Sequence, residues 1–143
     1  MLFRSNTEYK DQIYYALAEI AEKEGDIPAM MDYLQKSVKS SVANKIQKTT
    51  SYLKLAEVYF NAPDYRLAQA YYDSTVTLID KSYPNYDIIV NTKKSLSALV
   101  ACLNTISLED SLQRVARMTE NERDQLMNIF IVKFNVHKSM RVF

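Results

Sequence analysis

The fold is decided by residues 51–74, SYLKLAEVYFNAPDYRLAQAYYDS. Two runs of apolar residues with helical spacing lie on either side of the break Asn61-Ala62-Pro63-Asp64. Proline cannot continue a helix, and the side chain of Asp64 can cap the next one. This stretch therefore predicts a hairpin of two antiparallel helices.

The same pattern occurs 38 residues earlier, beginning with residues 8–26, EYKDQIYYALAEIAEKEGD. Gly25-Asp26 aligns with Pro63-Asp64, and glycine tolerates the left-handed conformation that ends many helices. Pro28 suits the first turn of the following helix, where its missing N–H is not needed. Apolar positions of the second helices align as well, Met30 with Ala68 and Leu34 with Tyr72. An internal repeat of this length indicates stacked helical hairpins.

We predict an all-α fold of about seven antiparallel helices in one domain, residues 5–134. The expected elements are hairpins at about 8–42, 43–82 and 85–118, a final helix over 119–134 and a C-terminal tail over 135–143. The third hairpin is degenerate, because Val100 stands at an offset of 44 where the second hairpin has Ala56. Helix starts are read from three stretches with capping residues: Ser5 to Glu8, Ser107 to Asp110 and Thr119 to Glu122.

The second hairpin resembles a tetratricopeptide repeat. The resemblance rests on aromatic, leucine and small residues at characteristic places: Tyr52, Leu55, Ala56, Tyr59, Tyr65, Ala68 and Tyr72. Small residues let the two helices approach closely, and the aromatic side chains fill the space toward the next hairpin. The resemblance implies a right-handed superhelix of hairpins that binds other proteins or peptides.

In stacked hairpins the first helix of each pair lines the inner groove. Side chains of these helices that packing does not use are the candidate binding residues: Gln12, Tyr15, Glu19, Glu22, Lys23, Thr50, Leu53, Glu57, Phe60 and Asn61. Tyr15, Leu53 and Phe60 are candidate apolar anchors for a peptide or helix, with charged neighbours setting specificity. The alternative is that another hairpin covers them.

The composition argues against several other classes of protein. The 143 residues carry 18 basic and 17 acidic side chains, so no surplus of positive charge attracts nucleic acid or an acidic membrane. The pairs Tyr14-Tyr15 and Tyr71-Tyr72 are therefore read as core residues and not as base-stacking platforms. The chain has no run of eighteen apolar residues, so we expect no membrane insertion of this segment.

We predict no catalytic residues, no metal site and no cofactor. Cys102 is the only cysteine and His137 the only histidine. A nucleophilic pair would need both groups within hydrogen-bond reach, whereas Cys102 reads as a small core residue in mid-helix. The carboxylates of residues 19–26 read as a solvated helix face. Glycine-rich phosphate loops and zinc-protease motifs are missing from the sequence.

Three stretches resemble a more particular family, the large tetratricopeptide lipoprotein of the type IX secretion and gliding-motility machinery of Bacteroidetes. They are residues 8–26, residues 51–74 and residues 106–131, ISLEDSLQRVARMTENERDQLMNIFI. Its more particular marks are Tyr71 to Ser74, Asp110 to Gln113 and Glu122-Arg123.

This resemblance implies an interaction scaffold in the periplasm, associated with the outer membrane. The chain departs from the family pattern in lacking a lipoprotein signal and in its apolar tail VKFNVHKSMRVF. The alternative is the repeat domain of a signalling receptor or transcriptional regulator, with a cytoplasmic location.

Overall fold

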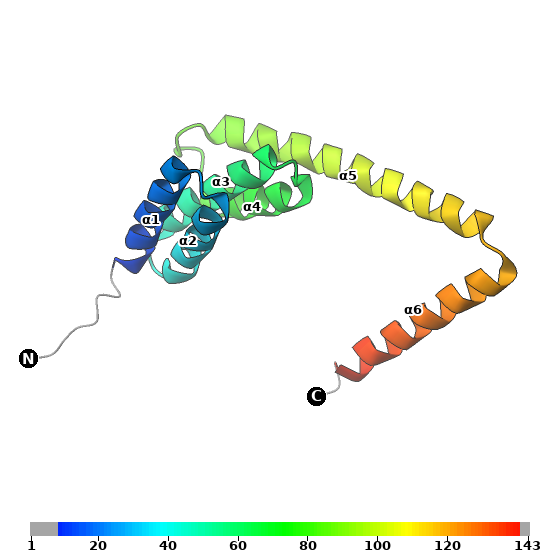
Figure 1. Ribbon diagram of the computed structural model, residues 1–143. Helices are drawn as coiled ribbons and strands as arrows, with labels where there is room; N and C mark the ends of the chain where they lie inside the picture. Colours follow the sequence, from blue (N-terminus) through cyan, green and yellow to red (C-terminus); the bar gives the residue numbers. More distant parts are fainter. Residues whose placement is uncertain (1–8, 141–143) are drawn as a thin grey trace, which may run out of the picture. The chain divides into compact units, whose positions relative to one another are not determined.

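The computed structural model describes residues 9–140, with only the backbone described at residues 134 and 136–140 (Figure 1). This part of the chain is all-helical, as predicted, and contains six helices instead of seven. The helices are α1 (Lys10–Glu24), α2 (Ile27–Ser40), α3 (Lys45–Asn61), α4 (Tyr65–Leu78), α5 (Tyr86–Arg117) and α6 (Glu120–Met140).

The chain divides into two compact units, Met1–Ala101 and Cys102–Phe143. In the first unit, α1 packs on α2, α2 on α3 and α3 on α4, while α1 also touches α3. The first part of α5 joins this unit through the buried side chains of Ile89, Leu96 and Val100. The first unit is therefore two consecutive helical hairpins followed by one more packed helix.

The turns of the two hairpins are built alike. The side chains of Asp26 and Asp64 cap α2 and α4, accepting hydrogen bonds from the amides of Ala29 at 3.0 Å and Leu67 at 3.2 Å. Gly25 ends α1 in the predicted left-handed conformation, with φ 77°. The predicted cap at Asp64 is confirmed, and Asp26 caps α2 at the position 38 residues earlier, as the repeat requires.

Buried positions follow the same offset of 38 residues. Five pairs of buried side chains share it: Asp11 and Thr49, Ala18 and Ala56, Met30 and Ala68, Leu34 and Tyr72, and Ser37 and Thr75. In α5, Ile89 and Leu96 follow Thr49 and Ala56 at an offset of 40, not the 44 predicted. The repeat is thus present in the packing as well as in the sequence.

The apolar core of the first unit consists of two adjoining clusters. The first lies in the N-terminal hairpin and reaches α3 through Leu55, and the second joins α3, α4 and α5 around Ala56, Ala68 and Leu96. Leu34 and Leu55 are completely buried. Truncating such a leucine to alanine typically costs 2–5 kcal/mol of folding free energy, so these two side chains are major contributors.

A buried set of polar side chains joins α1, α2 and α3, and we call it the polar seam: Asp11, Ser37, Ser41 and Ser51. The Ser37 hydroxyl lies 2.7 Å from the Asp11 carbonyl oxygen and 2.8 Å from Ser51 Oγ. The Ser41 hydroxyl lies 3.1 Å from the Asp11 carboxylate, which also accepts the amide hydrogen of Gln12. Apolar periodicity did not reveal this seam.

The predicted third hairpin does not form. The helix start expected at Ser107 lies inside α5, which continues without a break to Arg117. No glycine or proline interrupts residues 86–117, and the Ser111 hydroxyl donates to the carbonyl of Ser107 within the helix. Serine and aspartate favour helix starts, but they do not end a helix that neighbouring residues support.

The remaining helix starts have mixed outcomes. The capping box at Thr119 and Glu122 is confirmed, since the Thr119 amide donates to Glu122 Oε2 at 2.8 Å. The helix expected from about Val42 begins three residues later, where Asn44 caps α3. The capping box expected at Ser5 lies outside the described residues, and α1 has no side-chain cap at Tyr9.

Candidate functional site

The candidate site is a groove between α3 and α5, within the first unit. On α3 it is lined by Leu53, Glu57 and Phe60, spaced four and three residues apart, which places them on one face of the helix. On α5 the corresponding row is Ile88, Thr92 and Leu99. We call this surface the α3–α5 groove.

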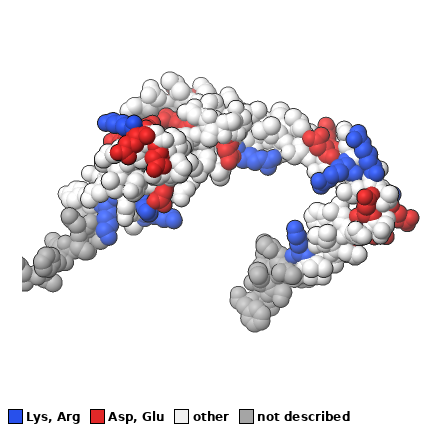
Figure 2. Space-filling model, viewed as in Figure 1, with Lys and Arg blue, Asp and Glu red and all other residues white. Residues whose placement is uncertain are grey.

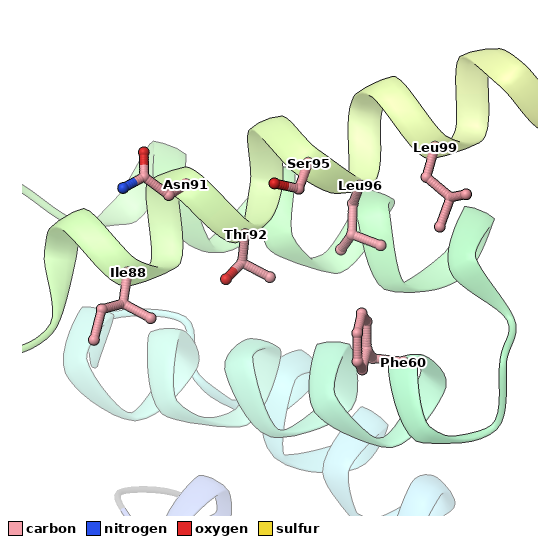
Figure 3. Close-up of a pocket in the computed structure, with 7 residues that line it drawn as sticks. All are labelled: Phe60, Ile88, Asn91, Thr92, Ser95, Leu96 and Leu99. Carbon is pink, nitrogen blue, oxygen red and sulfur yellow. The ribbon is translucent and has the colours of Figure 1, made fainter.

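Two adjoining pockets make up the groove and share Ile88 and Thr92. The larger has a volume of about 580 Å³ and is lined by Phe60, Ile88, Asn91, Thr92, Ser95, Leu96 and Leu99. The smaller, of about 250 Å³, contains Leu53 and Glu57 of α3 together with the turn residues Tyr83 and Pro84. Figure 3 shows the Phe60 ring rising from α3 toward α5, with Ile88, Leu96 and Leu99 directed at the same space.

The larger pocket presents apolar side chains to solvent. Phe60 is 44% exposed, Ile88 66% and Leu99 39%. The Phe60 and Tyr65 rings pack edge to face at a centroid distance of 5.8 Å, so Phe60 is supported from the neighbouring helix. A supported aromatic ring beside exposed aliphatic side chains is typical of an anchor site for an apolar group.

Glu57 is the one charged side chain among the described residues that line the groove. It is exposed, and it lies one helical turn before Phe60 on α3. The buried Tyr72 lines the same small pocket, and the pKa of Tyr72 is raised by burial and by the negative charge of Glu57. The groove is therefore an apolar surface with a single negative charge near its middle.

An acidic region lies beside the groove, where α1 meets α3. The pKa of Tyr15 is raised by burial and by the carboxylates of Glu19, Glu22 and Glu57, while Lys54 acts in the opposite direction. Lys54 Nζ lies 2.8 Å from Glu22 Oε1, and this hydrogen bond raises the pKa of the lysine. Figure 2 shows acidic side chains gathered over the first hairpin.

The residues predicted for the groove divide into three sets. Leu53, Glu57 and Phe60 line it together. Tyr15 is half-buried against the first core cluster, with Glu19 and Glu22 as neighbours, and so belongs to the acidic region. The others lie apart from the groove lining: Gln12, Lys23 and Asn61 are exposed, and Thr50 donates a hydrogen bond to the Ile46 carbonyl of its own helix.

The α5 side of the groove is absent from the sequence prediction. Ile88, Thr92 and Leu99 lie on α5, whereas the candidate residues were taken only from the first helices of the first two hairpins. The sequence did contain a pattern that indicates this surface. Ile89, Leu96 and Val100 form one row along α5, and Ile88 and Leu99 form a second apolar row beside it. Two neighbouring apolar rows on one helix indicate that one of them faces something other than the core.

The structure corrects the interpretation of Cys102 and leaves His137 open. Cys102 was expected in a core and is instead exposed on α5. The side chain of His137 lies outside the described residues. Among the side chains that are described, no three histidine, cysteine or carboxylate groups gather closely enough to hold a metal ion.

Tyr15, Tyr71 and Tyr72 belong to the core, as the interpretation of the tyrosine pairs expected, whereas Tyr14 is half-buried outside both core clusters. Tyr72 is buried, and the Tyr71 ring stacks on the Tyr59 ring at a centroid distance of 5.3 Å and an interplanar angle of 6°. The pKa of Tyr71 is raised by burial and by its neighbours Tyr59 and Tyr52. Tyr71 and Tyr72 therefore stabilise the second hairpin instead of offering free rings.

No model of a protein family matches this chain, and no curated protein gives a significant match. In the described part of the chain, none of the helices combines the length and apolar character needed to cross a bilayer.

Proposed function

We propose that this chain is a protein-binding scaffold and that the α3–α5 groove holds a helix or peptide of its partner. The observation that carries the proposal is the row of exposed apolar side chains, Phe60, Ile88 and Leu99, around a preformed pocket. The proposal is further supported by the resemblance of the second hairpin to a tetratricopeptide repeat and by the offset of 38 residues between the two hairpins.

Energetics favour an apolar group as the occupant of the larger pocket. Burying a leucine or phenylalanine side chain is worth about 1.5–3 kcal/mol. A guest side chain seated between Phe60 and Leu99 would remove apolar surface from water on both partners. Polar groups at the edge, such as Asn91 and Ser95, can then bind the backbone or polar side chains of the guest.

We further propose that the scaffold belongs to an exported lipoprotein of a type IX secretion or gliding-motility machinery. The support for this step is the resemblance of residues 8–26, 51–74 and 106–131. In that setting the hairpins form part of a right-handed superhelix, and the groove bridges components of the machine. The proposal includes no catalytic step.

Site-specific photocrosslinking in native cells tests both steps. A photoreactive amino acid replaces Leu99 at the edge of the groove, and a matched variant carries it at Lys36 on α2, an exposed position away from the groove. We expect the Leu99 variant to form a discrete adduct with another protein and the Lys36 variant to lack that adduct. Mass spectrometry then identifies the partner.

The results separate the two steps of the proposal. If both positions give the same adducts, or neither gives any, the groove is not the binding site. If the Leu99 adduct contains only cytosolic proteins, the exported assignment is wrong while the scaffold function stands.

A further inference from the structure

The chemistry of the groove specifies more than an apolar guest. Glu57 stands between the smaller pocket, which it shares with Leu53, and the larger pocket at Phe60. Within the described part of the chain Glu57 forms no ion pair. The nearby Lys54 is bonded to Glu22 at 2.8 Å, and the charge of Glu57 acts on Lys54 without a direct bond. A guest that covers the groove must therefore cover a carboxylate that forms no ion pair with the described residues.

We propose that the guest is a basic amphipathic helix, with an apolar residue in the larger pocket and a lysine or arginine paired with Glu57. This inference rests on the proposed binding function and adds the chemistry of the partner. Glu57 and Phe60 are three residues apart on α3, a rise of about 4.5 Å along the helix. The guest therefore carries its basic residue three or four positions from its apolar anchor.

The cost of removing water from Glu57 explains why the groove should prefer a basic guest over a neutral or acidic one. A carboxylate covered by an apolar or acidic guest loses water and gains nothing in return, which disfavours such guests. An arginine or lysine supplies a charge-assisted hydrogen bond in place of the lost water. Charge pairs of this kind contribute more to the choice of partner than to total affinity.

The acidic region beside the groove adds to the charge complementarity between the groove and a basic helix. Glu19 is exposed on α1, and Glu22 is only partly neutralised by Lys54 because both side chains remain accessible to solvent. These carboxylates and Glu57 all act on Tyr15, which places them around one point of the surface. A guest with a second basic residue on the α1 side would meet this region.

A peptide selection tests the proposal without knowledge of the natural partner. The full chain is presented to a displayed library of random peptides about 15 residues long, the length at which isolated helices begin to form. We expect enriched peptides to carry an apolar residue with lysine or arginine three or four positions away. Their affinity should fall as salt is raised, because added ions screen the pairing with Glu57.

Three variants assign the site. Glu57→Gln removes the charge, Phe60→Ala removes the anchor, and Glu24→Gln is the control, a similar change at an exposed position on α1 away from the groove lining. We expect Glu57→Gln to weaken enriched peptides about threefold to tenfold and Glu24→Gln to leave them unchanged. Circular dichroism confirms that each variant keeps its helical content.

The outcomes distinguish the two proposals. The basic-helix inference is overturned, and the binding function stands, in either of two cases. In the first, the enriched peptides need Phe60 but are neutral or acidic. In the second, they bind the Glu57→Gln variant as well as the parent chain. If no peptide is enriched, or enriched peptides ignore Phe60→Ala, the groove is not a binding site and both proposals fail.

Discussion

Ser37 is completely buried and yet polar, and its position explains how the first hairpin is held to α3. Its hydroxyl lies 2.7 Å from the Asp11 carbonyl oxygen on α1 and 2.8 Å from Ser51 Oγ on α3. Buried polar groups are stabilising only when they are paired, and these groups are. The polar seam therefore contributes directed contacts that apolar packing does not supply.

Replacing Ser37 by alanine should lower the free energy of unfolding by about 1–3 kcal/mol, because the Asp11 carbonyl oxygen and Ser51 Oγ both lose a buried partner. The measurement is urea denaturation followed by circular dichroism. Ser40→Ala, at the half-buried neighbouring position, is the control and should change stability much less. Equal losses in the two variants would show that the seam has no special role.

The polar seam also shows what sequence reasoning missed at the scale of single residues. Helical periodicity counts apolar side chains, so it gives no prediction for the buried aspartate, serine and threonine side chains. The offset of 38 residues held the missing information, since it pairs Asp11 with Thr49 and Ser37 with Thr75, all of them buried. Small polar side chains that recur at the repeat offset can therefore be predicted to be buried, even though polar residues are usually exposed.

At the scale of helices, the sequence was informative wherever a residue forbids continuation. The breaks at Gly25 and Pro63, and the turn at Pro84 where Asn85 adopts φ 61°, all occur as predicted. The break at Ser107 does not occur, because its residues only favour a helix start. Helix ends can therefore be predicted from residues that cannot continue a helix, such as proline. They are predicted much less well from residues that only favour a capping position.

Gly25→Ala should destabilise the chain by about 1 kcal/mol, because alanine is strained at φ 77°. An added Cβ would meet no atom within 4 Å, so the loss is conformational and not steric. Thermal unfolding of the alanine and asparagine variants gives the measurement. Asparagine tolerates the left-handed region better than alanine and should lose less stability. If both variants were as stable as the parent chain, the left-handed C-cap would not be needed.

At the scale of the whole molecule, the sequence predicted half of the candidate groove. The α3 side followed from the repeat, whereas the α5 side depended on which of two apolar rows faces the core. That choice is made by tertiary packing, through contacts such as Gln69 with Ser97 at 3.2 Å and Asp73 with Lys93 at 3.3 Å. Periodicity alone cannot rank two neighbouring rows of similar character.

The first unit should fold without the second. All of the buried side chains in the described part of the chain lie at or before Val100. A chain ending after Ala101 should therefore keep a thermal midpoint within a few degrees of the full chain. A chain ending after Leu78 is the contrasting variant, and it should be much less stable because it uncovers the second core cluster. An unfolded chain ending at Ala101 would contradict this view.

Alkaline pH should weaken the fold. Burial raises the pKa of Tyr15, Tyr71 and Tyr72 above the ordinary 10.0, and the bond to Glu22 raises the pKa of Lys54. In each case the folded state holds its proton more tightly than the unfolded state. This stabilisation is complete below about pH 10 and is lost as the pH rises through the folded-state values.

The thermal midpoint should therefore fall as the pH rises above about 10. Tyr71→Phe should make the decline shallower, because one of the groups that titrates differently in the two states is gone. A midpoint that stays level or rises over this range would show that these groups do not control alkaline stability.

The unbroken length of α5 has a consequence for the lifetimes of its hydrogen bonds. Its 32 residues span about 48 Å, and its first part carries Ile89, Leu96 and Val100 in the core, whereas no residue of α5 after Val100 is buried. Backbone amides exchange with deuterium through local opening, which packed segments resist. One continuous helix should therefore contain slow amides before Ala101 and fast amides beyond it. Exchange followed residue by residue would reveal where cooperative structure ends, at a point where the ribbon itself shows no break.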